Sequence, residues 1–215
     1  AAARWVCATT MSSAPWGTST VKASGDGSFP PIDQAADGPT LQGLRLGRIK
    51  AFADGSIQGF SARIRWPGYH NGAPNGLWYT APEQLAELYR LALAAGIQVH
   101  THTNGDEATE MVLDTLEPAL KETPSPDHRF TLQHCQLADA AQFRQMAKLG
   151  MCVNLFANHH FYWGDEHYAL TVGPERAERM NACRTALNNN IGAQLPSSAS
   201  RYGTSSSAGL AVIFT

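Results

Sequence analysis

The feature of this sequence that most constrains its fold is an alternation of strand-like and helix-like blocks between Arg48 and about Leu187. Short apolar runs are followed by longer segments whose apolar residues recur at helical spacing. The strand-like runs are RIKAFAD (48–54), IQVHTHT (97–103), RFTLQH (129–134) and MCVNLF (151–156). This repeated order predicts an α/β fold, in which helices pack against a mostly parallel sheet.

The helix-like blocks have recognisable ends. Thr80 and Glu83 have the spacing of a capping box, and Pro82 suits a first helical turn. Gly96 is placed to end this first helix. Three further helices are predicted over 105–122, from a cap at Asp139 to Gly150, and over 174–187.

The two flanking segments differ from this middle block in composition. Residues 1–47 are rich in Gly, Ser, Pro and Ala and have little periodicity, which predicts an irregular N-terminal segment. Residues 191–215 form a Ser-rich tail without a recognisable pattern. We therefore expect residues 48–190 to form the folded domain.

Composition narrows the classes of function. Of the 215 residues, 43% are apolar and 16% are charged, as in an ordinary globular protein. The net charge of -2 and the lack of a Lys/Arg cluster argue against nucleic acid as a partner. No apolar run approaches the ~18 to 20 residues that a membrane span needs. The opening AAARWVCATT lacks the layout of a signal peptide, so a cytoplasmic location is expected unless a signal has been lost.

Two architectures are compatible with alternating strands and helices, namely a doubly wound open sheet and a (β/α)8 barrel. In both, chemistry collects where the strands end, and His102 and His134 each end a predicted strand. No G-x-G-x-x-G or P-loop sequence follows a strand, so nucleotide binding is not favoured. We therefore expect about four βα units of a partial (β/α)8 TIM-type barrel.

His102 and His134 are the first candidates for metal ligands. A lone histidine at a strand end is most often a hydrogen-bonded core residue. Two of them on neighbouring strands would lie within a few ångströms of each other, and neutral imidazole is the commonest metal ligand. His100 faces the same side of its strand as His102, because side chains alternate along a strand.

Lys50 lies inside the first predicted strand, where an unpaired ammonium group is costly to bury. It could reach the surface, or pair with a nearby carboxylate such as Asp54. Alternatively, its amine could have reacted with carbon dioxide to give a carbamate, an anionic ligand able to bridge two cations.

Two further segments border the predicted site. Asp106 begins a helix, where a carboxylate is favoured as an N-terminal cap and can also fix the preceding turn. After the fourth strand, NHHFYWGDEHY (158–168) is predicted to be a loop rich in histidine and aromatic residues. It would be either an ordinary aromatic packing loop or part of a substrate pocket, with His159, His160 and Trp163 as candidate contacts.

Four motifs occur in order along the chain: IKAFADGS, VHTHTNGDEA, RFTLQHCQL and FANHHFYWGD. Together they resemble the metal-dependent amidohydrolase superfamily, in particular large amidohydrolases similar to N-substituted formamide deformylase. The resemblance runs from about Arg48 to Leu187. It implies a (β/α)8 barrel with a small β-sandwich built from both chain ends.

The resemblance also implies roles for individual residues. Lys50 corresponds to the lysine of a K-x-x-x-D-G-S strand, which is implied to be a carboxylated, bridging metal ligand. His102 begins an H-x-x-G-D motif and His134 ends the next strand, and both are implied to be metal ligands. His100 is not at a ligand position, so a supporting role is implied, in which it fills the interior or donates a hydrogen bond behind the site.

Two motifs of that superfamily are not found. Its first strand carries an H-x-H pair that binds metal, whereas this chain has no histidine before His70. Its last metal-binding strand carries an H-S-D motif whose aspartate is ligand and general base, whereas the residues after TALNNNIG read AQLPSSASRYGTSSS. We therefore expect the chain to lack the first and last metal-binding strands.

These observations predict a fragment of a hydrolase that acts on C–N bonds of small, non-peptide amide-type substrates with metal-activated water. A divalent cation is expected, zinc first, with iron or manganese as alternatives. Because its ligand set is incomplete, the chain is expected to be weak or inactive alone, and no catalytic residue is assigned. The competing hypothesis is a non-catalytic half-barrel scaffold or cation-binding remnant. Exposed sheet edges would favour a homo-oligomer.

Overall fold

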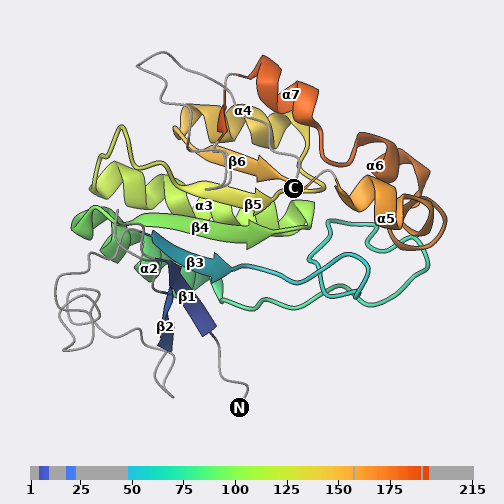
Figure 1. The fold of residues 1–215 in the computed structure, drawn as a ribbon, viewed down its shortest axis with the longest axis horizontal. Helices are drawn as coiled ribbons and strands as arrows, with labels where there is room; N and C mark the ends of the chain where they lie inside the picture. Colours follow the sequence, from blue (N-terminus) through green and yellow to red (C-terminus); the bar gives the residue numbers. More distant parts are fainter. Residues whose placement is uncertain (1–4, 10–17, 23–47, 157, 190, 194–215) are drawn as a thin grey trace.

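One mixed sheet organises the residues that the computed structural model describes, which are 5–9, 18–22, 48–156, 158–189 and 191–193. Its seven strands have the order β2-β1-β3-β4-β5-β6-β7 (Figure 1). The parallel strands are β3 (Arg48–Phe52), β4 (Gln98–Thr103), β5 (Thr131–His134), β6 (Cys152–Leu155) and β7 (Gly192–Ala193). The α/β class predicted from the alternating pattern is confirmed.

The segment before β3 contributes two strands that its composition did not indicate. β1 (Trp5–Thr9) and β2 (Thr18–Lys22) pair in antiparallel orientation, and β1 also pairs antiparallel with β3. The prediction of an irregular segment is therefore wrong for these two stretches. Pairing onto an edge strand imposes extended backbone on residues that have no periodic pattern of their own.

The predicted tail, residues 191–215, contains a short strand near its start. Gly192–Ala193 forms β7 and pairs with Cys152 and Val153 of β6. The other predictions for residues 1–47, and those for residues 194–215, lie outside the described residues.

The first helix begins one residue later than its sequence signal. α2 (Pro82–Ala95) has the expected proline in its first turn and ends at Gly96, whose φ is 66°. Its N-cap is Ala81 rather than the predicted Thr80. The Ala81 N–H donates to Oε1 of Gln84 (3.3 Å), so the glutamine takes the part expected of Glu83.

The next two helices follow their predicted blocks. α3 (Asp106–Glu122) occupies the second block, and α4 (Ala140–Lys148) occupies the third. Asp139 caps α4 as predicted, because its carboxylate accepts hydrogen bonds from the N–H groups of Ala141 and Gln142. In the part of the chain that the structure describes, no helix is long and apolar enough to cross a membrane.

Two predictions between β6 and β7 are wrong. The residues expected to form a long aromatic loop instead form α5 (Asn158–Glu166), which is followed by the π-helical turn η1 (His167–Thr171). This stretch contains no proline and only one glycine, Gly164, so its residues do not prevent a helix.

The helix predicted over 174–187 is interrupted. It forms α6 (Gly173–Arg179) and α7 (Cys183–Asn188), and the break lies at Asn181, which has a φ of 53°. The Asn181 N–H donates to the carbonyl oxygen of Gln136 at 2.8 Å. A tertiary hydrogen bond thus replaces the helical one at a residue type that tolerates the left-handed region.

The two faces of the parallel sheet have different side chains, because successive residues of a strand point in opposite directions. Buried apolar residues occupy one face, where α2, α3 and α4 pack (Figure 1): Ile49, Ala51, Val99, Leu132 and Val153. By strand register, the opposite face carries polar residues: Lys50, His100, His102, Gln133 and Asn154.

A long connection, residues 53–80, joins β3 to α2 and lies with α5, η1 and α6 beyond the carboxyl ends of the strands (Figure 1). A second apolar cluster anchors it there: Ile57, Ala62, Ile64, Tyr69, Leu137, Val172, Ala177 and Met180. The edge of the sheet where chemistry collects in α/β folds is therefore covered by ordered structure.

Candidate metal centre

His102 and His134 lie together at the carboxyl ends of neighbouring strands. β4 and β5 are paired in the sheet, and the ring centroids of the two histidines are 4.7 Å apart. The rings are inclined at 70° to each other, so neither stacks flat on the other. The structure thus brings together the two histidines that the sequence placed at strand ends.

The backbone at the end of β5 turns His134 toward His102. In the strand register, His134 lies opposite Thr103 and Leu155, and Leu155 belongs to the core on the helix-covered face. His134 and Cys135 have positive φ angles of 70° and 48°, which are uncommon for residues other than glycine. This left-handed turn breaks the alternation and places the imidazole beside His102.

Contacts at one ring nitrogen orient His102. Its Nε2 lies 3.0 Å from the carbonyl oxygen of Gly55 and 3.0 Å from Nδ2 of Asn104. The side-chain amide of Asn104 donates to the same carbonyl oxygen at 2.7 Å. A carbonyl oxygen accepts and an amide N–H donates, so the first contact suits a protonated Nε2 and the second an Nε2 with its lone pair. Metal-binding histidines commonly have their second nitrogen held by such contacts.

Both rings are neutral at pH 7. Burial lowers the pKa of His102 to about 4 and the pKa of His134 to about 3. The charge of Lys50 lowers both pKa values further, and His102 adds to the effect on His134. A neutral imidazole is the form that binds a metal ion, since protonation occupies the lone pair.

Lys50 lies on the polar face of the sheet, on the strand next to β4. Its Nζ is 4.9 Å from the centroid of the Phe52 ring, and that ring is 5.1 Å from the ring of His102. As an ammonium group Lys50 would repel a metal cation, and as a carbamate it would attract one. Its chemical form therefore decides its role.

His100 is buried on the same face, farther from the carboxyl end of β4. Its Nδ1 lies 2.6 Å from Nε2 of Gln133, whose Oε1 accepts a hydrogen bond of 2.8 Å from the side-chain amide of Asn154. These contacts cross from β4 through β5 to β6. His100 thus takes part in a polar chain inside the sheet face through its contact with Gln133.

Asp54 is a site residue whose role was missed in the sequence. Its side chain is fully buried, and its carboxylate accepts hydrogen bonds from the N–H groups of Arg63 (3.0 Å), Asn104 (2.9 Å) and Gly105 (2.8 Å). Burial raises the pKa of Asp54 to about 7, and these N–H groups oppose that rise. An acid directly after a strand and before glycine was the available signal, but its three partners are remote in sequence.

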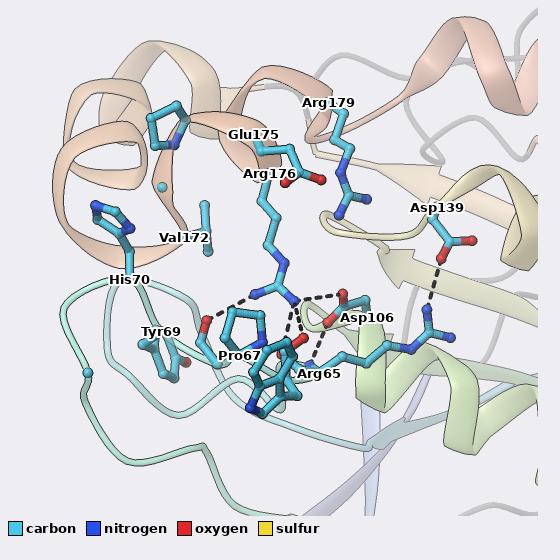
Figure 2. Close-up of a pocket in the computed structure, with 15 residues that line it drawn as sticks. Arg65, Pro67, Tyr69, His70, Asp106, Asp139, Val172, Glu175, Arg176 and Arg179 are labelled. Carbon is cyan, nitrogen blue, oxygen red and sulfur yellow. Dashed lines mark hydrogen bonds and ion pairs between the residues drawn. The ribbon is translucent and has the colours of Figure 1, made fainter.

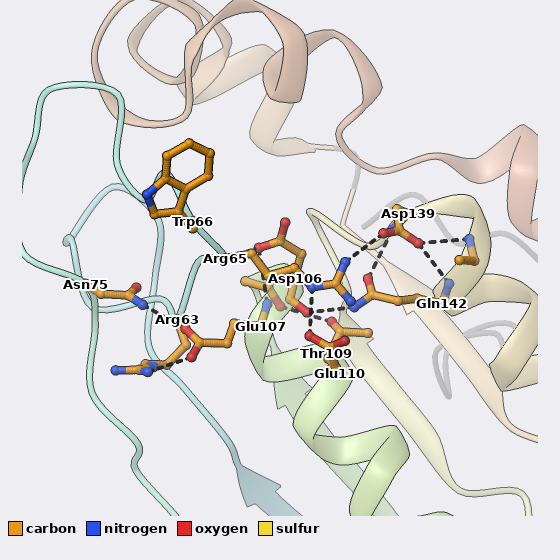
Figure 3. A network of polar contacts seen from close by, with 12 residues as sticks. Arg63, Arg65, Trp66, Asn75, Asp106, Glu107, Thr109, Glu110, Asp139 and Gln142 are labelled. Carbon is orange, nitrogen blue, oxygen red and sulfur yellow. Dashed lines mark hydrogen bonds and ion pairs between the residues drawn. The ribbon is translucent and has the colours of Figure 1, made fainter.

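Asp106 has a different function from the predicted N-cap. It is the first residue of α3, after the N-cap Gly105, and its Oδ1 accepts a hydrogen bond from the Arg65 N–H at 2.9 Å. Figure 3 shows this contact within a network in which the Arg65 guanidinium lies between Glu110 and Asp139, at 2.8 Å from each. Asp106 therefore supports the H-x-x-G-D turn by binding the connection to it.

The three predicted substrate residues lie on α5 and have different surroundings. The His159 ring is 4.9 Å from the Phe156 ring, which is 5.5 Å from the ring of His134. Nε2 of His160 lies 2.8 Å from the carbonyl oxygen of Met180, and Trp163 is 39% exposed. Of the three, His159 is the one connected to the histidine pair through ring contacts.

The donor set fits part of a metal coordination shell. His102 and His134 supply two neutral imidazoles, and the hydrogen-bond contacts of His102 are made by its Nε2. Among the described residues, no group of three His, Cys, Asp or Glu side chains is arranged to hold a metal ion. Zinc sites use three or four protein ligands. Further ligands would have to be a carboxylated Lys50 or groups beyond the described residues.

Comparison with known proteins agrees with the motifs. A model of the Amidohydrolase family matches residues 3–196. Protein LONG AFTER FAR-RED 3 of Arabidopsis thaliana is 30% identical over 149 residues, which are 68% of this chain and 25% of that protein. The putative amidohydrolase YtcJ of Bacillus subtilis (strain 168) is 28% identical over 149 residues, which are 69% of this chain and 27% of that protein. The chain thus spans about a quarter of the length of these relatives.

Solved structures share the fold. An uncharacterized metal-dependent hydrolase from Pyrococcus furiosus has a TM-score of 0.57 at 22% identity, covering 67% of this chain and 29% of its own. Its counterpart from Pyrococcus horikoshii OT3 has a TM-score of 0.55 at 22% identity, covering 67% of this chain and 28% of its own. The family match also begins well before Arg48, so it includes β1 and β2, which the motifs did not reach. With its match over residues 3–196, this chain belongs to the amidohydrolase family, within the metal-dependent amidohydrolase superfamily.

Proposed function

We propose that this chain is part of a metal-dependent hydrolase that acts on C–N bonds of small, non-peptide amide-type molecules. The observation that carries the proposal is the pairing of His102 with His134, two neutral imidazoles at the ends of adjacent parallel strands. Family membership and the names of the two Pyrococcus structures support hydrolysis that depends on a metal. The matched region is 25% of one relative and 27% of the other, so the proposal concerns the site rather than the activity of this chain alone.

We also propose that the parallel strands form part of a (β/α)8 barrel. β3 to β7 follow each other in sequence order, and α2, α3 and α4 pack on one face of the sheet. A doubly wound sheet would reverse its strand order and carry helices on both faces. In a barrel, the polar face with Lys50 and His102 would point to the interior, and the strand ends would form the active face.

Some residues of this chain would bind the cation, and others would orient the ligands. His102 and His134 would hold a divalent cation, with zinc as the first choice and iron or manganese as alternatives, and a carboxylated Lys50 would be a further ligand. When bound, such a cation supplies hydroxide at neutral pH and polarises the carbonyl group of the substrate. The Gly55 carbonyl and the Asn104 amide would orient His102 through Nε2, and the Asp54 carboxylate would hold the turn that follows β4.

A zinc titration of the purified chain tests the proposed site. We expect stoichiometric binding that weakens by ~tenfold or more in His102→Ala and in His134→Ala, because loss of even an outer-shell partner commonly costs that much. His70→Ala is the matched control, since His70 is exposed and away from the pair. Unfolding midpoints of the metal-free variants would show whether each remains folded.

Assays on N-formyl and N-acyl substrates then test the reaction. Turnover that follows zinc content and is lost in His134→Ala would support hydrolysis by the proposed site. Zinc binding without turnover would favour the competing hypothesis of a cation-binding remnant. Equal zinc affinity in the unsubstituted chain and in both histidine variants would overturn the site.

A further inference from the structure

A cavity lined in part by Asp106 lies apart from the histidine pair. It has a volume of about 660 Å³ and is bounded by the connection from Arg65 to Gly72 and by the segment from Val172 to Arg179 (Figure 2). Neither His102 nor His134 lines it. This volume is in the range of pockets that bind small molecules.

Hydrogen bonds join the walls of the cavity. The buried guanidinium of Arg176 donates to the carbonyl oxygens of Gly68 (2.9 Å) and Arg65 (2.9 Å) across the cavity floor. The His70 N–H donates to the carbonyl oxygen of Thr171 at 2.7 Å. A pocket whose walls are already fixed requires little ordering when it binds a ligand.

Two of the three arginines at the cavity are already paired. Arg65 makes ion pairs of 2.8 Å with Glu110 and with Asp139. Arg176 lies 3.6 Å from the carboxylate of Asp106, in addition to its bonds to carbonyl groups. The carboxylates on the cavity floor are therefore neutralised by neighbours.

The third arginine lacks such partners. Arg179 points from α6 into the cavity, and no hydrogen bond or ion pair joins its guanidinium to another described residue (Figure 2). A guanidinium presents a planar set of N–H donors that matches a carboxylate in two-point geometry. Glu175, four residues earlier, is exposed at the same wall, so a second negative charge on a ligand would be repelled there.

The remaining wall offers an apolar surface. Pro67 and Val172 line the cavity, and the indole of Trp66 at the same cavity is 92% exposed. When a ligand covers a large aromatic side chain that is exposed to water, the burial of apolar surface favours binding.

We propose that this cavity binds a small monocarboxylate with an apolar or aromatic body. The carboxylate pairs with Arg179, and the body lies over Trp66, Pro67 and Val172. The site is separate from the proposed metal centre and does not depend on it. Asp106 lines the cavity, so a bound ligand would contact the residue whose carboxylate joins the H-x-x-G-D turn to the connection after β3.

Calorimetric titration of the full chain with 3-phenylpropionate tests this site, with 3-phenylpropionamide as the neutral analogue of the same shape. We expect the carboxylate to bind at least about tenfold more tightly than the amide, the ratio that one charge-assisted pair supplies. Arg179→Gln should reduce the affinity for the carboxylate to that for the amide and leave the affinity for the amide unchanged. Glu175→Gln, the control on the same helix, should retain or increase binding of the carboxylate.

Two further measurements distinguish binding at this cavity from binding at the metal centre and from non-specific binding of anions. His134→Ala should bind 3-phenylpropionate as the unsubstituted chain does, whereas a loss there would place the ligand at the metal centre and overturn the proposal. Inorganic phosphate should compete weakly, because Glu175 opposes its second charge. Equal binding of acid and amide, or unchanged binding by an Arg179→Gln chain with a normal unfolding midpoint, would also overturn it.

Discussion

Asp54 joins two segments of backbone through a fully buried side chain. Its two carboxylate oxygens accept from N–H groups of the connection after β3 and of the turn after β4. The same turn carries Asn104, which shares the Gly55 carbonyl with His102. The orientation of a candidate ligand therefore depends on an acid that need not touch the metal.

Asp54→Asn should destabilise the chain markedly. An amide has one acceptor oxygen in place of two, and its NH2 group would face an N–H donor that is already buried. We expect the free energy of unfolding to fall by about 2 to 3 kcal/mol in urea titrations. Asp114→Asn, on the exposed surface of α3, should change it by less than about 0.5 kcal/mol. Equal effects of the two substitutions would contradict the role assigned to Asp54.

The turn between β4 and α3 packs directly against the connection after β3. A Cβ atom on Gly105 would fall on the backbone carbonyl group of Arg63, which has no flexible side chain to move aside. The φ of Gly105 is -78°, which any residue can adopt. Glycine is therefore required here by the close approach of the two backbones and not by its backbone angle.

Gly105→Ala should therefore push the connection away from the turn. We expect a loss of about 1 to 3 kcal/mol in the free energy of unfolding, as for overpacked interiors. Gly164→Ala in α5 is the matched comparison, because a Cβ there meets no atom within 4 Å. It should be neutral or stabilising by up to ~1 kcal/mol, since alanine favours a helix over glycine. Circular dichroism during thermal unfolding would measure both, and a neutral Gly105→Ala would refute the close approach.

The π-helical turn η1 carries a histidine that is held neutral. His167 is fully buried and its Nδ1 lies 2.8 Å from the hydroxyl of Thr171. Burial lowers the pKa of His167 to about 4, and the neighbouring His159 lowers it further, while Glu166 opposes the shift. An unfolded histidine has a pKa near 6.5, so the unfolded chain binds the proton first as the pH falls.

The stability that His167 contributes should thus be present above about pH 6.5 and be lost toward pH 4. The free energy of unfolding should decrease between pH 7 and pH 4 by about 2 to 3 kcal/mol more in the unsubstituted chain than in His167→Gln. Urea unfolding of both chains at the two pH values gives this difference directly. Parallel losses in the two chains would show that His167 does not contribute.

Across the whole molecule, Arg176 connects parts that are far apart in sequence. Its guanidinium bonds to carbonyl oxygens 108 and 111 residues away and lies 3.6 Å from Asp106 at the start of α3. One buried side chain thus joins α6, the connection after β3 and the turn beside the candidate metal centre.

Arg176→Gln should loosen this junction, with a loss of about 3 kcal/mol or more, because it leaves Asp106 and several carbonyls without their buried partner. Arg90→Gln removes an exposed i,i+3 pair with Glu87 and should leave the free energy of unfolding nearly unchanged, because solvent screens such a pair. Hydrogen exchange at residues 65–70 should accelerate in the first variant and remain unchanged in the second. Unchanged exchange in Arg176→Gln would contradict the junction.

The sequence predicted the parts of this molecule that local pattern determines. Strands and their parallel order follow from periodicity, and the position of His102 and His134 at one edge follows from the rule that parallel strands end there. The left-handed turn at His134, which brings the two rings together, does not follow from either. The break at Asn181 and the partners of Asp54 depend on contacts across the fold, which no local pattern contains. β1 and β2 were missed for the same reason, since their extended form comes from pairing rather than from alternation. The barrel and the third metal ligand stay predictions.

The left-handed backbone of His134 has a consequence for how this site persists over evolutionary time. At a φ of 70°, glycine is the residue with the least conformational penalty, and glycine has no imidazole. Selection for a stable chain and selection for a ligand therefore favour different residues at this one position. A relative that lost the proposed metal site would be free to replace this histidine by glycine, which removes the imidazole and the conformational penalty together.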